Sequence, residues 1–213
     1  MGYATILDIV GSVITGGILL LILARTNASA VQNTYNSNSD LITQENLAQV
    51  VYVLENDFRK IGFMGDYLKA AQLDPTKAIL YADTSSIRFL ADTRDHGVMD
   101  TVYYYLGPTS EQSNTPNPND RLLYRSVTSV NDSDISFTRS GSLGITQFYL
   151  TYFDDFGNQL STPVSAPGAI HEIQITLQVQ NLEGYKGQYD STTQYVTSYW
   201  RQIRLATRNL RDR

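Results

Sequence analysis

The sequence has no cysteine and only two histidines, His96 and His171, among 213 residues. The lack of cysteine excludes a disulfide framework and a thiolate metal site. Two histidines far apart in the chain offer little material for a metal centre or for nucleophile–histidine catalysis. No G-x-S-x-G, H-E-x-x-H or G-x-x-x-x-G-K-[ST] motif occurs. We therefore expect neither enzyme activity nor a cofactor.

Basic residues are also scarce, with 16 Lys plus Arg against 21 Asp plus Glu and a formal net charge of −5. This mild acidity argues against general nucleic-acid binding, which needs a basic face. Tyrosine is abundant, with 15 residues, and Asn, Ser and Thr are frequent. Such a composition suits a β-rich domain outside the cytoplasm.

An almost wholly apolar run extends from Tyr3 to Ala24 and contains one charge, Asp8. A helix of about 20 residues spans the ~30 Å hydrocarbon core of a bilayer. A charge at the bilayer centre costs roughly 2.5–3.5 kcal/mol. Asp8 therefore either lies at the membrane surface, where the positive end of the helix dipole also favours it, or has a partner cation.

The run contains Gly11, Gly16 and Gly17, and the adjacent pair weakens a helix. An Asn/Ser-rich stretch of poor helix propensity follows at 27–40. We expect the helix to break in this part of the chain. The sequence predicts three segments: an apolar helix over 1–27, a polar stretch and amphipathic helix over 28–75, and a β domain over 76–213.

Residues 40–63 have a helical pattern, with apolar residues at spacings of four and three. Packing of this stripe on a sheet is favoured over a free coiled coil. The helix–sheet packing residues are expected to be Leu47, Val51, Leu54, Phe58 and Ile61.

From Ala78 the apolar residues alternate with period two, which indicates strands separated by polar turns. Long consecutive strands favour an antiparallel sheet. The predicted fold class is therefore α+β. The expected strands are 78–83, 86–92, 101–107, 121–127, 134–140, 145–154, 170–180 and 194–209.

Two charged groups near the C-terminal end are candidate sites. Arg201, Arg204 and Arg208 have three possible roles: pairing with an acidic neighbouring subunit, contact with a membrane surface, or a solvated strand and tail. The solvated strand is favoured over subunit pairing, because exposed ion pairs contribute little. Asp154 and Asp155 offer oxygen ligands for calcium. Ordinary turn chemistry explains these two residues better, since calcium needs roughly 6–8 oxygens.

Three segments together resemble the type IV pilin and type II secretion pseudopilin superfamily, nearest the PilW-like minor pilins and J-type pseudopilins. The first is the acid-bearing apolar helix YATILDIVGSVITGGILLLIL, and the second is QENLAQVVYVLENDFRKIGFMGD. The third is the C-terminal series LTYFDDFGN, IHEIQITLQV and RQIRLATRNLR. The chain differs in carrying aspartate where the family has glutamate and in lacking a basic leader. If processing follows Gly2, Asp8 lies one residue late.

The resemblance implies a long N-terminal helix packed on an antiparallel sheet, and a structural subunit of an extracellular or cell-envelope filament. It implies a membrane-embedded state before assembly, with copies of the chain, other pilin subunits and the pilus assembly machinery as partners. Asp8 would pair with the N-terminal amine of a neighbouring subunit, and Gly11, Gly16 and Gly17 would lie in the assembly helix. The alternative is a single-pass, membrane-anchored β domain that binds or adheres without polymerising.

Overall fold

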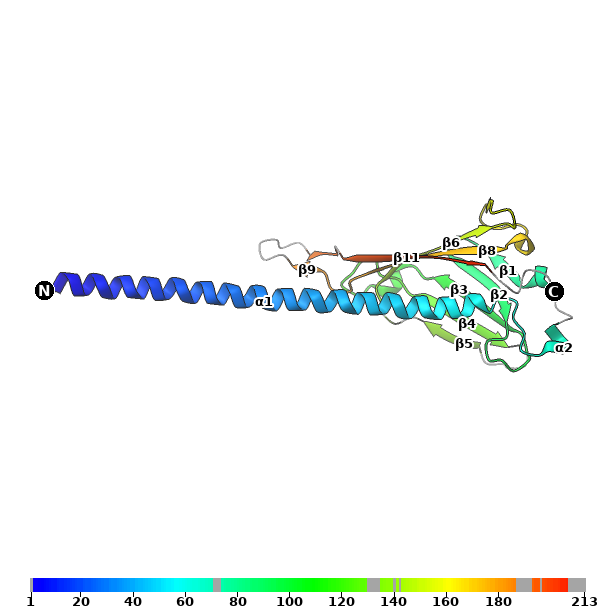
Figure 1. Cartoon of the computed structure of the whole chain (residues 1–213), viewed down its shortest axis with the longest axis horizontal. Helices are drawn as coiled ribbons and strands as arrows, with labels where there is room; N and C mark the ends of the chain where they lie inside the picture. The colour runs from blue at the N-terminus through cyan, green and yellow to red at the C-terminus, as the bar shows by residue number, and fades with distance from the viewer. Residues whose placement is uncertain are drawn as a thin grey trace.

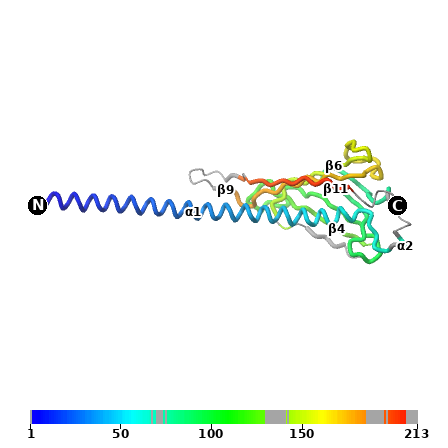
Figure 2. The backbone as a smooth tube through the Cα atoms, in the orientation of Figure 1, coloured from blue at the N-terminus to red at the C-terminus, as the bar shows by residue number. Residues whose placement is uncertain are grey.

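The computed structural model describes residues 2–70, 74–129, 135–139, 141, 143–186, 193–195 and 197–206. A single helix, α1 (Gly2–Arg59), runs along one side of a β domain. Its first half projects away from the domain and its second half lies against it (Figures 1 and 2). The α+β class and the antiparallel pairing expected from the sequence are confirmed.

The expected break in the helix is wrong, because α1 continues through both the glycine pair and the Asn/Ser-rich stretch. In that stretch the Thr34 hydroxyl donates to the Ala30 carbonyl at 3.0 Å, and Gln32 Nε2 donates to Asn36 Oδ1 at 2.9 Å. These contacts between residues four apart satisfy polar side chains within the helix. Strong helical segments flank the stretch, so extending the helix through it needs no new nucleation.

Five strands form the first sheet, in the order β1-β2-β3-β4-β5, with each neighbouring pair antiparallel. Sequence neighbours pair throughout, as in a meander. The strands are β1 (Ile79–Ala82), β2 (Ser86–Ala91), β3 (Asp100–Leu106), β4 (Leu123–Ser129) and β5 (Ile135–Arg139).

Four strands form the second sheet, in the order β11-β8-β6-β7, and two short strands pair separately as β10-β9. Three strands of two residues each, β7, β9 and β10, were too short to produce a sequence pattern. The strands are β6 (Ile145–Phe153), β7 (Gln159–Leu160), β8 (Glu172–Gln180), β9 (Tyr185–Lys186), β10 (Thr193–Gln194) and β11 (Ser198–Ala206). The short helices are α2 (Tyr67–Ala70), η1 (Pro75–Lys77), η2 (Thr109–Gln112) and η3 (Pro167–Ala169).

One hydrophobic core joins the second half of α1 to both sheets. Leu54, Phe58 and Ile61 are at most 1% exposed, and Val51 is also buried, while Leu47 packs against the core from a partly buried position. The Phe58 ring lies 5.5 Å from the ring of Phe89 on β2. The predicted stripe thus faces the sheets.

Gly144, just before β6, has a backbone φ of +73°. A Cβ atom at this position would lie 2.1 Å from the Gln180 carbonyl oxygen. Both the left-handed backbone and the close approach require glycine. The approach allows the Gln180 N–H to donate to the Gly144 carbonyl at 2.7 Å, which closes the start of β6 onto the end of β8.

We predict that Phe58→Ala lowers the free energy of unfolding by about 3–5 kcal/mol, because it removes a buried aromatic ring shared by the helix and the sheet. Urea unfolding of the full chain in detergent micelles, followed by near-UV circular dichroism, measures the change. Tyr52→Ala is the matched control on the same helix, since Tyr52 is 76% exposed, and it should change stability by less than about 0.5 kcal/mol. Equal effects of both substitutions would contradict the assignment of the core.

Candidate functional site

The projecting half of α1 is the most unusual surface of the described chain. From Tyr3 to Leu23 its large apolar side chains are between 50% and 88% exposed, and they cover all sides of the helix. By length and composition this helix could cross a membrane.

Three hydroxyl groups of this half donate hydrogen bonds to the backbone of the helix itself. Ser12 donates to the Asp8 carbonyl at 2.8 Å, Thr15 to the Gly11 carbonyl at 2.8 Å, and Thr26 to the Ile22 carbonyl at 2.9 Å. Back-bonding of this kind satisfies these three hydroxyls without water. The segment is therefore suited to apolar surroundings despite its polar residues.

The helix brings some of the predicted assembly residues together and separates others. Asp8, Gly11, Ser12 and Thr15 are spaced by three, one and three residues, so they lie on one face. Gly17 follows Asp8 by nine residues and lies on the opposite side. Around Gly11, Gly16 and Gly17 nothing comes within 4 Å of an added Cβ, so nothing in the single chain requires glycine there.

A buried polar contact joins the end of α1 to the first sheet. The Tyr104 hydroxyl donates to Asp57 Oδ2 at 2.6 Å, and Arg125 Nε donates to the same oxygen at 2.5 Å. Asp57 is 4% exposed. Since a buried carboxylate is costly without partners, this pairing dictates how α1 must sit on β3 and β4.

The same contact shifts two pKa values. Burial, followed by the charge and hydrogen bond of Asp57, raises the pKa of Tyr104 far above its ordinary value. Burial alone would lower the pKa of Arg125, but the hydrogen bond to Asp57 and the electrostatic interactions with Tyr104 and Asp57 outweigh burial and raise it. Arg125 therefore stays charged and Tyr104 stays protonated at neutral pH.

Sequence reasoning missed this contact, although signals for it exist. Asp57 lies three residues after Leu54, within the apolar stripe of the helix. Arg125 alternates in phase with the buried Leu123 and Val127 on β4. A charged residue on the apolar face of α1 and one of opposite charge on the inward face of β4 favour an ion pair between the two. Their actual contact depends on how the helix packs on the sheet.

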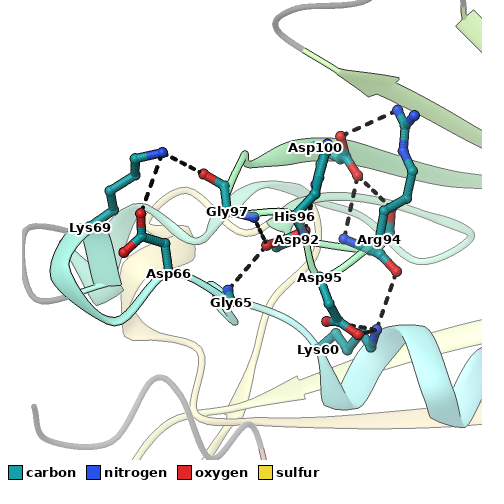
Figure 3. Close-up of polar contacts among 11 residues, drawn as sticks. Lys60, Gly65, Asp66, Lys69, Asp92, Arg94, Asp95, His96, Gly97 and Asp100 are labelled. Atoms are coloured by element: carbon teal, nitrogen blue, oxygen red, sulfur yellow. Dashed lines mark hydrogen bonds and ion pairs between the residues drawn. The ribbon is translucent and has the colours of Figure 1, made fainter.

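A second polar cluster lies in the loop between β2 and β3 (Figure 3). Asp92 is fully buried, and its carboxylate accepts the backbone N–H groups of Gly97 at 2.7 Å, Gly65 at 3.1 Å and His96 at 3.1 Å. The His96 ring nitrogen Nδ1 lies 2.9 Å from Asp92 Oδ1. Because these groups already bind both carboxylate oxygens, the cluster stabilises the loop and is not suited to binding a ligand.

Two lysines hold the same loop from outside (Figure 3). Lys60, just after α1, donates to the Thr93 carbonyl at 3.2 Å and forms an ion pair with Asp95 at 3.3 Å. Lys69 donates to the Gly97 carbonyl at 3.0 Å. The loop thereby connects the end of α1 to the first sheet.

The hydrogen bonds to Asp92 also control its ionisation. Burial alone would raise the pKa of Asp92, but the hydrogen bonds from His96, Gly97 and Gly65 outweigh burial and hold the pKa well below its usual range. The charged carboxylate is thus the form that the folded loop requires.

The predicted calcium candidates are committed to other contacts. Asp154 accepts hydrogen bonds from the backbone N–H of Phe156 and from both nitrogens of Asn158, and the Asn158 side chain is the main cause of its lowered pKa. Asp155 lies 3.4 Å from the His171 ring. Among the described residues no group of three or more His, Cys, Asp or Glu could hold a metal ion. The geometry is that of a turn.

The C-terminal arginines do not form one cluster. Arg204 forms an ion pair with Glu172 of the same chain and lies over the Phe153 ring at 4.1 Å. Arg201 is exposed on β11, and Arg208 lies outside the described residues. Arg204 is thus paired within the chain, whereas the Arg201 side chain is exposed to solvent.

The tyrosines of β3 lie on both faces of the first sheet. Tyr104 points into the core, whereas Tyr103 and Tyr105 stack at 5.1 Å on the outer face, and Tyr124 stacks on Tyr105 at 4.7 Å. Alternation along the strand prevents the three consecutive residues from forming one stack.

No protein-family model, no curated protein and no solved structure matches the chain. The resemblance to pilins therefore stays a prediction that rests on the sequence motifs.

We predict that Asp57→Asn and Arg125→Leu each lower the free energy of unfolding by about 1–3 kcal/mol, because each leaves a buried partner without its charged hydrogen bond. Urea unfolding of both single variants and the double variant forms a thermodynamic cycle. The free energy of unfolding of the double variant should fall by less than the sum of the decreases in the two single variants. Strict additivity would contradict the direct contact.

We predict that acid weakens the fold through Asp92. Its pKa is lower in the folded chain than the unfolded value of about 3.9, so the unfolded chain binds more protons in this range and stability falls as pH falls from about 5. Asp92→Asn should lower the free energy of unfolding at pH 7. It should also make this free energy less dependent on pH between pH 5 and pH 2, as measured by urea unfolding.

The control for this pH dependence is Asp95→Asn in the same loop. The Asp95 side chain is 61% exposed, and its positive φ of 56° is one that asparagine tolerates. This variant should keep the wild-type pH dependence. If the dependence of stability on pH is flattened in both variants, Asp92 is not the group that causes the acid sensitivity.

Proposed function

We propose that the chain is a structural subunit of a helical filament on the cell surface or in the cell envelope, of the type IV pilus or pseudopilus kind. The role is architectural and non-enzymatic. The observation that carries the proposal is the projecting apolar half of α1, joined without a break to a folded β domain (Figure 1). At about 1.5 Å per residue, residues 2–30 extend roughly 44 Å.

An apolar surface on every side of a helix cannot stay in water, so lipid or other helices must cover it. The face formed by Asp8, Gly11, Ser12 and Thr15 favours helices. Small residues there let a neighbouring helix approach closely, and Asp8 offers a carboxylate to a neighbour's cation. A helix that only anchors a domain in lipid needs neither feature.

The proposed sequence of events has two states. Before assembly the apolar half lies in the inner membrane, and in the filament it packs on copies of itself or on other pilin subunits delivered by the assembly machinery. Because α1 is continuous, the β domain is carried at a set height outside the helical core. The competing role is a membrane-anchored adhesion or binding module that never polymerises.

We predict that Asp8→Ala lowers the yield of sheared filaments at least about tenfold. Removal of the acid leaves a buried cation unpaired at a cost of about 3–5 kcal/mol, and 1.4 kcal/mol already corresponds to tenfold. Electron microscopy of filaments from the producing cells, with mass spectrometry of the subunit's N-terminus, measures the yield and identifies the amine. Glu45→Ala is the control, because Glu45 is an exposed acid in the other half of the same helix.

Replacement of residues 3–24 by a leucine–alanine helix of equal length separates the two roles. The filament proposal expects a membrane-bound monomer and no filaments. An unchanged cell-surface function in this variant, with no filaments from the wild type, would establish the anchored module instead.

A further inference from the structure

A polar pocket of about 430 Å³ lies beside the edge of β6. The turn between β1 and β2 forms one wall through Thr84 and Ser85, and the outward side chains of β6 and β8 form another. This volume falls within the roughly 300–1,000 Å³ typical of small-ligand sites. We propose that this pocket, extended along the outer face of the second sheet, binds an acidic oligosaccharide.

Side-chain amides and hydroxyls make up the uncharged polar groups of the pocket. Each amide carries both a donor and an acceptor, so it can bind a sugar hydroxyl, which also donates and accepts. Threonine hydroxyls add groups of the same kind. The amides that line the pocket are those of Asn119, Gln147, Gln178 and Gln180.

Part of this lining is held in place before any ligand binds. Asn117 Nδ2 donates to Gln180 Oε1 at 3.2 Å, and Asn119 Nδ2 lies 3.5 Å from the same oxygen. Gln178 Nε2 donates to Ser198 Oγ at 2.5 Å. Fixed amides lose less conformational freedom on binding than free ones, which favours affinity.

Arg121 gives the pocket its charge preference. Among the described residues that line the pocket it is the one charged residue, and none of these residues is acidic. Its backbone N–H donates to the Ile145 carbonyl at 2.8 Å, which places it at the start of β6. A guanidinium binds a carboxylate through two parallel hydrogen bonds. In a chain of net charge −5, this local positive charge points to a sugar that carries a carboxylate.

Two exposed aromatic rings provide surfaces for the apolar face of a sugar ring. Tyr149 lines the pocket and is 48% exposed. Trp200, the single tryptophan of the chain, is 67% exposed on β11. Trp200 is paired with Gln178, and Gln178 with Gln147, so the three lie in one row across the sheet. Side chains directly opposite in such a row have Cβ atoms about 4.5–5.5 Å apart.

This row extends the site beyond the pocket, so it suits a chain of several sugars rather than one. The face is open, because alternate residues of β11 point the other way. Tyr199 accepts a hydrogen bond from Gln44 of α1 at 2.9 Å, and Leu205 is buried in the core. The face of Trp200 therefore points away from α1.

The test uses the full chain in polyoxyethylene detergent micelles, since a sugar-based detergent would compete for the site. Titration calorimetry measures binding of tetragalacturonate, its neutral methyl ester and cellotetraose. We expect saturable binding of tetragalacturonate, at least tenfold weaker binding of the methyl ester, and no dependence on filament formation. No saturable binding of tetragalacturonate, or equal binding of all three probes, would overturn the proposal.

Variants assign the binding to this site. Arg121→Gln should weaken the binding of tetragalacturonate at least tenfold while leaving the binding of the methyl ester unchanged. Trp200→Ala should weaken the binding of both sugars about fivefold. The controls are Arg88→Gln, on the outer face of the first sheet over Tyr103, and Phe156→Ala, an 88% exposed aromatic on the β6–β7 turn. Binding that responds equally to the control variants would also overturn the proposal. Thermal unfolding of each variant verifies the fold.

Discussion

The contact of one helix face with two sheets is the constraint on which this structure depends. Leu54, Phe58 and Ile61 lie in the same core as the inward residues of both sheets. Without the helix, each sheet would expose an apolar face to water. The helix therefore completes the core that the two sheets share. The sheets are also joined directly, since the Leu150 N–H donates to the Thr84 carbonyl and the Tyr152 hydroxyl donates to the Asp83 carbonyl.

Polar contacts set the position of the helix within this core. Apolar packing alone tolerates small shifts of a helix along a sheet, whereas a buried carboxylate does not. Asp57 with Tyr104 and Arg125 fixes the helix against β3 and β4, and Lys60 with the loop around Asp92 fixes its end. The direction in which the apolar half projects is a consequence of these contacts some 60 Å away, at about 1.5 Å per residue from Gly17 to Asp57.

This arrangement separates the surfaces of the molecule by role. The apolar half of α1 needs a cover that the β domain does not provide, while the outer face of the second sheet carries amides, an arginine and exposed rings. The two surfaces lie on different elements and in different directions. The two proposals, a helix covered by other helices or lipid and a sheet face that binds a ligand, therefore concern separate surfaces of the chain.

Periodicity in the sequence by itself determined the apolar stripe of the second half of α1 and the inward faces of the longer strands. The stripe of α1 and the alternation of Ile173, Ile175, Leu177 and Val179 follow directly from burial of every third or fourth residue in a helix and every second residue in a strand. Continuity of α1 could not be read from propensity, because hydrogen bonds between residues four apart and strong flanking segments outweigh two glycines and an Asn/Ser-rich stretch. The contact of Asp57 with Arg125, and the placing of Arg121 and Gln178 in the lining of one pocket, depend on strand order and register. Those are long-range contacts, and only the tertiary structure decides them.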